Sequence, residues 1–145
     1  AKQVYHMGAV GTGNTTKMLN NLIKDINLAG TMEGLVAGAA LGVDMDAFFE
    51  VVLNASGGSR QWERVAPAVL ARDFTPTAVT KGLSRTQKSM KQLMESAGAP
   101  TPMFDTARQL WLQAIEQGLG ELSSSEAVRV LEKQAGVEVK GRAAE

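Results

Sequence analysis

Apolar residues along this chain recur at intervals of three and four positions, which is the spacing of one face of an α-helix. The longest run extends from Asn14 to about Leu41. A helix of that length would span roughly 40 Å, at about 1.5 Å per residue. Its apolar positions are Met18, Leu19, Leu22, Ile23, Ile26, Met32, Leu35, Val36 and Ala39. The pattern therefore predicts one unusually long helix as the first element of the fold.

A row of glycines lies along this predicted helix, at Gly30, Gly34, Gly38 and Gly42. Glycine in a helix interior costs about 1 kcal/mol relative to alanine, so such a row is unfavourable in an isolated helix. Because residues four apart share one face, we expect the row to mark the close approach of another element.

Five shorter helical segments follow, separated by residues that favour turns. They are expected from Asp44 to about Asn54, from Gln61 to about Ala71, from Val79 to Gly98, from Met103 to about Gln117 and from Ser123 to about Ala135. Asp44 is the expected N-cap of the first, and Ser123 and Glu126 form a capping box at the last. No hairpin signal or strand–helix alternation is present, so the sequence predicts an all-α fold of five to seven helices.

The two ends of the chain carry weaker patterns than the middle. Residues 1–13 run into glycines without an initiator methionine or a capping signal, which indicates a fragment of a longer protein. Residues 14–136 make up the predicted helical domain. Residues 137–145 are expected to be a disordered tail, because they continue no helical pattern.

Composition and charge exclude several functions. With 145 residues, 44% of them hydrophobic, the chain can bury one core and is expected to form one domain. Fifteen basic residues balance fifteen acidic ones, so neither nucleic acid nor an anionic membrane is an expected partner. Cysteine is absent, and His6 has no clustered partners, so no metal site is expected. The chain also lacks a run of about 18 apolar residues, and we expect a soluble, cytoplasmic protein.

The segment GAVGTGNTTKMLNN, residues 8–21, has three possible interpretations. A Walker A loop would need a lysine where Asn14 stands, so the charge that holds phosphates is missing. A dinucleotide-binding turn would need a third glycine where Thr16 stands, and no strand follows the helix. The third interpretation is a glycine-rich turn before a helix whose N-cap is Asn14, Thr15 or Thr16.

Lys17 and Asn21 add possible chemistry to this segment. Their spacing of four residues places both side chains on one face of the predicted helix. A lysine in the first turn faces the positive end of the helix dipole, which is an unfavourable position for an ammonium ion. An amine in such a position suits general acid and base catalysis, and a carboxamide one turn away can hold a substrate oxygen. The residues permit a catalytic pair but do not require one.

Two other polar features have open interpretations. The loop from Ser56 to Ser59 is rich in glycine, so it could bind a carboxylate through backbone amides or could simply connect two helices. Lys81, Arg85, Lys88 and Lys91 form a basic run on one predicted helix. We interpret the run as a whole as a solvated polar face rather than a phosphate site.

The glycine-rich segment resembles a known family signature. Gly8, Gly11, Gly13, Lys17 and Asn21 match the pattern G-x-x-G-x-G-x-x-x-K-x-x-x-N of the β-hydroxyacid dehydrogenases, the group that contains 3-hydroxyisobutyrate dehydrogenase and tartronate semialdehyde reductase. The resemblance continues through NASGGSRQWE, TKGL and AGAPTP and covers nearly the whole chain. It implies an all-α domain like the C-terminal domain of 6-phosphogluconate dehydrogenase, built on one long helix. Residues 1–13 would then be the end of, and the linker from, a missing Rossmann domain.

The resemblance also implies roles for individual residues in hydride transfer between NAD or NADP and a short β-hydroxy acid. Lys17 matches the catalytic lysine, and Asn21 and Gly13 match substrate-binding positions. Lys81 matches a lysine near the cofactor, although Gly82 stands where the family has aspartate. The implied partners are the Rossmann domain, a small hydroxy acid and further copies of the chain. The isolated chain is expected to be inactive, and the alternative function is a non-catalytic helical dimerisation or interaction module.

Overall fold

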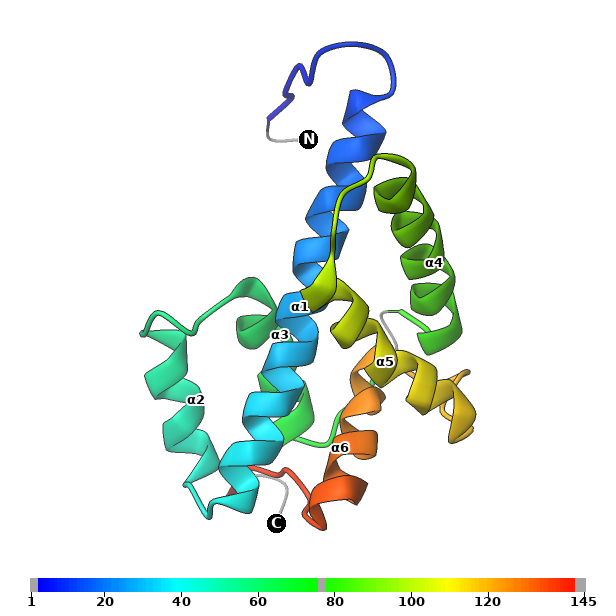
Figure 1. Ribbon diagram of the computed structural model, residues 1–145. Helices are drawn as coiled ribbons and strands as arrows, with labels where there is room; N and C mark the ends of the chain where they lie inside the picture. Colours follow the sequence, from blue (N-terminus) through cyan, green and yellow to red (C-terminus); the bar gives the residue numbers. More distant parts are fainter. Residues whose placement is uncertain (1–2, 76–77, 143–145) are drawn as a thin grey trace.

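The computed structural model describes residues 3–75 and 78–142, which form an all-α domain around one long helix (Figure 1). The helices are α1 (Thr12–Ala40), α2 (Met45–Leu53), α3 (Arg60–Leu70), α4 (Thr80–Ser96), α5 (Pro102–Glu116), the short 3-10 helix η1 (Ser124–Ala127) and α6 (Val128–Ala135). These described residues contain no strand, only an isolated bridge between Val79 and Ser123. No helix among them is long and apolar enough to cross a membrane. The predicted fold class is confirmed.

Helix α1 is the central element, and its 29 residues confirm the predicted long helix. It begins at Thr12, two residues before the predicted start, and the expected side-chain cap from Asn14, Thr15 or Thr16 is wrong. The N-cap is Gly11, whose φ of 96° lies in the left-handed region that favours glycine. The backbone, rather than a polar side chain, therefore sets the start of the helix.

Two of the four glycines along α1 explain how neighbouring helices approach it closely. A Cβ at Gly38 would lie 3.2 Å from the Phe48 ring, and one at Gly34 would lie 3.8 Å from the Trp62 ring. Gly30 has open space beside it, and Gly42 lies in the turn after the helix with a φ of 72°. The predicted close approach is thus confirmed at Gly34 and Gly38 only.

The core forms around the C-terminal half of α1. Helices α2 and α3 pack on one side of it and α5 and α6 on the other, while α4 packs along α5. Trp62 of α3 and Trp111 of α5 are both buried, and their indole N–H groups donate to the carbonyl oxygens of Phe49 and Ser124, each at 3.1 Å. Each tryptophan thus joins two segments without leaving a buried polar group unpaired.

The predicted starts of two shorter helices have different outcomes. Asp44 is the N-cap of α2, because its Oδ1 accepts hydrogen bonds from the backbone N–H groups of Asp46 and Ala47, both at 3.1 Å. The capping box at Ser123 and Glu126 is wrong, because η1 precedes α6 and no side-chain cap bond forms there. The Glu126 N–H donates to the backbone carbonyl of Ser123 at 2.9 Å, and the Glu126 carboxylate pairs with Arg129 at 2.9 Å.

The segment after α6 is ordered through residue 142, so the expectation of a disordered tail is wrong for residues 137–142. Val139 is fully buried, and the Gly141 N–H donates to the Leu70 carbonyl at 2.8 Å. Arg142 donates to Asp46 through its backbone N–H at 2.9 Å and through Nε at 3.1 Å. These long-range contacts attach the segment to α2 and α3.

Candidate active site

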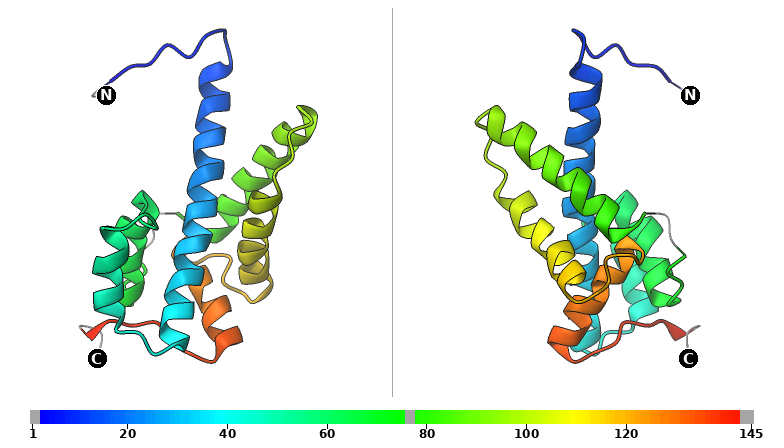
Figure 2. Two further views of the ribbon diagram at one scale, coloured as in Figure 1. Left: turned by 60° about the vertical axis from the view of Figure 1, so that its left-hand side comes forward. Right: turned by 90° about the vertical axis from the view of Figure 1, so that its right-hand side faces the viewer.

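The first turns of α1 carry the residues of the family signature and extend beyond the core. Figure 2 shows these turns projecting past the bundle in both views. No residue of α1 before Asp25 is buried. Lys17 is exposed and Asn21, one turn later, is half-buried. The two residues share a helix face, as their spacing predicts, but within this chain they lie on an open surface.

Space around the candidate catalytic residues is open on this chain alone. Gly13 is exposed in the first turn of α1, and a Cβ there would meet nothing within 4 Å. Lys17 forms no salt bridge within residues 3–75 and 78–142. The ammonium group is therefore accessible to a ligand or to another domain approaching from outside.

Lys81 lies in a different part of the molecule from Lys17. It is the second residue of α4, and its backbone N–H donates to the carbonyl of Gly120 at 3.0 Å. Its Nζ forms an ion pair with Glu121, with both side chains largely exposed. Because α4 runs back along α1 in the opposite direction, the first turn of α4 lies far from the first turns of α1 (Figure 1). The structure does not bring Lys81 and Lys17 together within this chain.

A buried polar contact fixes how α4 crosses α1. Asp25 is fully buried, and its Oδ2 accepts a hydrogen bond from Nε2 of Gln87 at 3.0 Å. Its other oxygen, Oδ1, lies 2.8 Å from Nζ of Lys24. Charged hydrogen bonds of this kind in a buried setting hold two helices in a defined register. Asp25 therefore ties the projecting half of α1 to the core, two turns below Lys17.

The glycine- and serine-rich loop serves mainly as a helix start. Ser59 is the N-cap of α3, with its Oγ accepting from the Trp62 N–H at 3.1 Å. The Gly58 N–H donates to the Ala55 carbonyl at 3.1 Å, so this amide is already used within the loop. A Cβ at Gly58 would lie 2.9 Å from the Val52 carbonyl oxygen, which explains the glycine.

The loop also forms one wall of a polar groove against α1, which the sequence does not reveal by local pattern. The groove has a volume of about 650 Å³. It is lined by Asn20, Ile23, Lys24, Asn27, Gly58, Ser59, Arg60, Gln61 and Arg64. The only available sequence signal is the four-residue spacing of Asn20 and Lys24 on α1 and of Arg60 and Arg64 on α3, which places each pair on one helix face.

The described residues could supply only part of a nicotinamide dinucleotide site. They contain no strand and so no βαβ unit, which is the element that holds the pyrophosphate in a Rossmann fold. The side chain of Lys81 is exposed enough to reach a single polar group of such a cofactor, and the open space at Gly82 leaves room beside it. One basic side chain fits an edge contact but not the whole dinucleotide.

Comparison with protein families assigns the chain to a class of oxidoreductases. A family model described as "NAD-binding of NADP-dependent 3-hydroxyisobutyrate dehydrogenase" matches residues 11–131. L-threonate dehydrogenase of Cupriavidus necator is 27% identical over 144 residues, which cover 99% of this chain and 48% of the relative. 2-(Hydroxymethyl)glutarate dehydrogenase of Eubacterium barkeri is 29% identical, covering 97% of this chain and 47% of the relative.

Solved structures have the same fold. A 3-hydroxyisobutyrate dehydrogenase from Salmonella typhimurium matches with a TM-score of 0.83 and 23% identity over 88% of this chain and 45% of that one. The corresponding enzyme from Mycobacterium tuberculosis matches with a TM-score of 0.80 and 21% identity, over 90% and 47% of the two chains.

The fold and the family match define a helical domain of the nicotinamide-dependent oxidoreductases. The chain belongs to the β-hydroxyacid dehydrogenase family, in the 3-hydroxyisobutyrate dehydrogenase group. NAD or NADP is the cofactor of this family. The chain spans about half the length of the curated relatives that it matches.

Proposed function

We propose that this chain is the substrate domain of an NAD- or NADP-dependent β-hydroxyacid dehydrogenase, with Lys17 as its general acid and base. The family match is the observation that carries the proposal. The accessible position of Lys17 on the projecting turns of α1 supports it, because a reacting alcohol must be able to reach the amine. The substrate class is a short β-hydroxy acid or its semialdehyde.

The chemistry assigned to Lys17 is one proton transfer at the substrate oxygen. In the oxidative direction the neutral amine takes the proton from the hydroxyl group while a hydride leaves the adjacent carbon. In the reductive direction the ammonium returns that proton to the carbonyl oxygen. NAD or NADP, when bound, accepts or supplies the hydride. Asn21 orients the substrate through its carboxamide, and Gly13 leaves space for the substrate to approach the helix backbone.

The second wall of the site is assigned to an N-terminal Rossmann domain of the same protein. The open surface around Lys17 and Asn21 supports this assignment, since a catalytic amine works in a cleft that excludes water. Lys81 is assigned a contact with the cofactor in the complete enzyme. The isolated chain should therefore be inactive, and turnover by residues 1–145 alone would contradict the domain assignment. We also propose a cytoplasmic setting, supported by the absence of cysteine.

Substitution of the lysine tests the catalytic role. In the full-length enzyme, Lys17→Ala should lower kcat by at least about a hundredfold, the lower end of general acid and base contributions. Lys88→Ala, which removes an exposed lysine of α4, is the matched control and should leave kcat unchanged. Normal turnover of the Lys17→Ala enzyme with short hydroxy acids would overturn the proposal.

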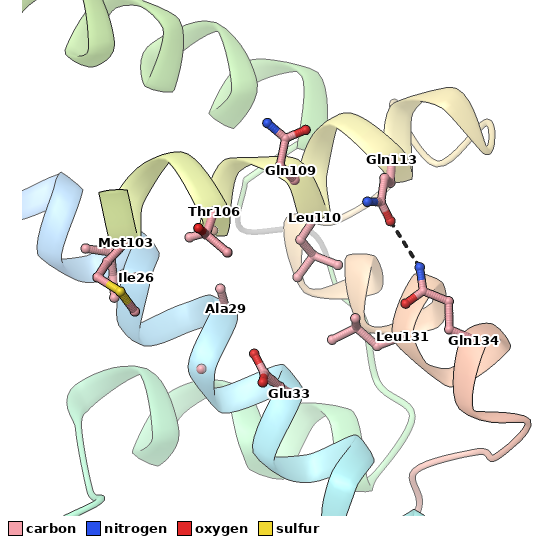
Figure 3. Close-up of a pocket in the computed structure, with 12 residues that line it drawn as sticks. Ile26, Ala29, Glu33, Met103, Thr106, Gln109, Leu110, Gln113, Leu131 and Gln134 are labelled. Atoms are coloured by element: carbon pink, nitrogen blue, oxygen red, sulfur yellow. Dashed lines mark hydrogen bonds between the residues drawn. The ribbon is translucent and has the colours of Figure 1, made fainter. Parts of the chain in front are cut away.

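We further propose that the complete protein is a homo-oligomer in which a groove between α1, α5 and α6 contacts a second copy (Figure 3). The groove has a volume of about 330 Å³, and Glu33 is the only charged residue among those that line it. Interfaces between copies are depleted of charge at their centre in this way. Met103, at the edge of the groove, is 65% exposed.

The oligomer proposal is tested by light scattering after size-exclusion chromatography. Met103→Glu should shift the protein towards the monomer, since the new carboxylate would be buried without a partner. Met103→Leu is the control and should keep the native mass. The same groove also favours the second candidate function, a non-catalytic helical interaction module. Self-association of the full-length protein, combined with no turnover of any short hydroxy acid with NAD or NADP, would favour that alternative.

A further inference from the structure

The polar groove between α1 and α3 carries an excess of positive charge. Three basic residues line it, namely Lys24, Arg60 and Arg64, and no acidic residue does. Lys24 is partly neutralised, because its Nζ lies 2.8 Å from the carboxylate of Asp25. Arg60 and Arg64 form no salt bridge within residues 3–75 and 78–142. The groove therefore presents two guanidinium groups without acidic partners.

The other lining residues suit an anion as well. Asn20, Asn27 and Gln61 place carboxamide groups along the groove, and these can donate hydrogen bonds to a carboxylate or phosphate oxygen. Arg60 and Arg64 are four residues apart on α3, so their side chains share a face of the helix. Planar guanidinium groups bind carboxylates and phosphates through paired N–H donors, which gives direction as well as charge.

The groove begins next to the proposed catalytic turn. Asn20 lies three residues after Lys17 on α1, and Lys24 lies seven residues after it. At about 1.5 Å per residue, these positions are roughly 5 and 10 Å from Lys17 along the helix axis. A small molecule whose hydroxyl group reaches the Lys17 amine can therefore place a second group in the groove without leaving the surface of α1.

We infer that the groove lined by Arg60 and Arg64 binds a second anionic group of the substrate, so that the preferred substrates are hydroxy acids with two negative charges. The second anion, a carboxylate or a phosphate, lies roughly 5 to 10 Å from the reacting hydroxyl group. This inference rests on the proposed dehydrogenase function for the identity of the ligand, but the binding of an anion to the groove can be measured without any turnover.

The first test measures anion binding to the chain itself by NMR, with butanedioate and inorganic phosphate as anionic probes and propanamide as the uncharged control. Butanedioate or phosphate should shift the backbone amides of residues 20–27 and 58–64, while uncharged propanamide at the same ionic strength should shift them at least about threefold less. The double variant Arg60→Gln with Arg64→Gln should lose these shifts. Arg85→Gln on α4 is the matched control and should retain them. Equal shifts with butanedioate and propanamide would overturn the inference.

The second test compares two substrates in the full-length enzyme that differ by one carboxylate, 2-(hydroxymethyl)butanedioate and 2-(hydroxymethyl)propanoate. The double variant should lower kcat/KM for the dianion by about ten- to a hundredfold and change that for the monoanion less than about twofold. An equal loss for both substrates would overturn the inference and assign the two arginines a structural role. If phosphate but not butanedioate shifts these amides in the NMR titration, a dicarboxylate substrate is ruled out. The ligand class is then a phosphorylated hydroxy acid.

The two tests separate the inference from the function on which it rests. Amide shifts that depend on Arg60 and Arg64, in a full-length protein without dehydrogenase activity, would refute the proposed function but retain the anion site. Dehydrogenase activity on monoanionic hydroxy acids, together with no anion-dependent shifts, would retain the function and refute the site.

Discussion

The ion pair of Glu132 and Arg72 should contribute strongly to stability, because it joins three segments at once. The Glu132 side chain is 8% exposed, and its Oε1 accepts hydrogen bonds from Nη1 of Arg72 and from the Val139 N–H, the latter at 2.8 Å. Nη1 of Arg72 also donates to the Val139 carbonyl at 3.2 Å. This network attaches the segment after α6 to α6 itself and to the end of α3.

The size of the effect follows from the burial of the two partners. Hydrogen bonds to charged groups contribute about 1.5 to 3 kcal/mol each, and removing one partner of a buried ion pair costs about 3 to 5 kcal/mol. Arg72 is 22% exposed, so water can partly solvate it after the change. Glu132→Gln keeps the shape and one acceptor, and we therefore expect a loss of about 2 kcal/mol in the free energy of unfolding.

Urea denaturation, followed by tryptophan fluorescence, measures this loss. With an m-value of about 2 kcal/mol per M, the midpoint of Glu132→Gln should fall by about 1 M. Glu138→Gln is the control, because Glu138 also lies 3.5 Å from Arg72 but is 62% exposed, and it should cost less than about 0.5 kcal/mol. If the two variants unfold at the same urea concentration, burial does not determine the strength of this pair.

Two further predictions concern the contacts around α2. The pKa of Asp46 lies below its usual value of 3.8, because the backbone N–H and the side chain of Arg142 donate hydrogen bonds to its carboxylate. The contact between Asp46 and Arg142 should therefore persist at pH 4 and be lost only as the pH falls below 3.8. A pH titration of the Arg142 amide by NMR with a midpoint above 3.8 would contradict this expectation. Gly58→Ala should cost about 1 to 3 kcal/mol in thermal unfolding, because its Cβ would lie 2.9 Å from the Val52 carbonyl oxygen. Gly57→Ala, with its Cβ 3.6 Å from a methyl group of Val52, should be nearly neutral, and equal losses for both would show that backbone crowding is not the cause.

The long helix and its neighbours were predictable because their signals are local. The apolar period of α1 and the cap at Asp44 depend on residues within a few positions of one another. The start of α1 was predicted too late because Gly11 caps it by a left-handed backbone conformation, which leaves no polar side chain as a signal. The capping box at Ser123 failed because the Glu126 N–H donates to the backbone carbonyl of Ser123 and the Glu126 carboxylate pairs with Arg129.

The remaining features depend on contacts between distant parts of the sequence. The segment after α6 is held in place by hydrogen bonds to Glu132, Leu70 and Asp46. No local sequence pattern indicates such contacts. The polar groove also depends on distant parts of the sequence, because Arg60 and Arg64 line it only where α3 lies beside Lys24 of α1. Lys17 and Asn21 were found through a family signature, and their use in catalysis stays a prediction.

Because α1 is one continuous helix, a small tilt of the helix at its buried part is amplified at its projecting N-terminal end. Lys17 stands eight residues beyond the buried pivot at Asp25, which is about 12 Å along the axis, so a tilt of only about 5° would move the amine by about 1 Å. A displacement of that size is enough to slow an enzymatic step about a hundredfold. On the proposed catalytic role of Lys17, substitutions that loosen the packing around Asp25 should therefore impair turnover before they impair folding.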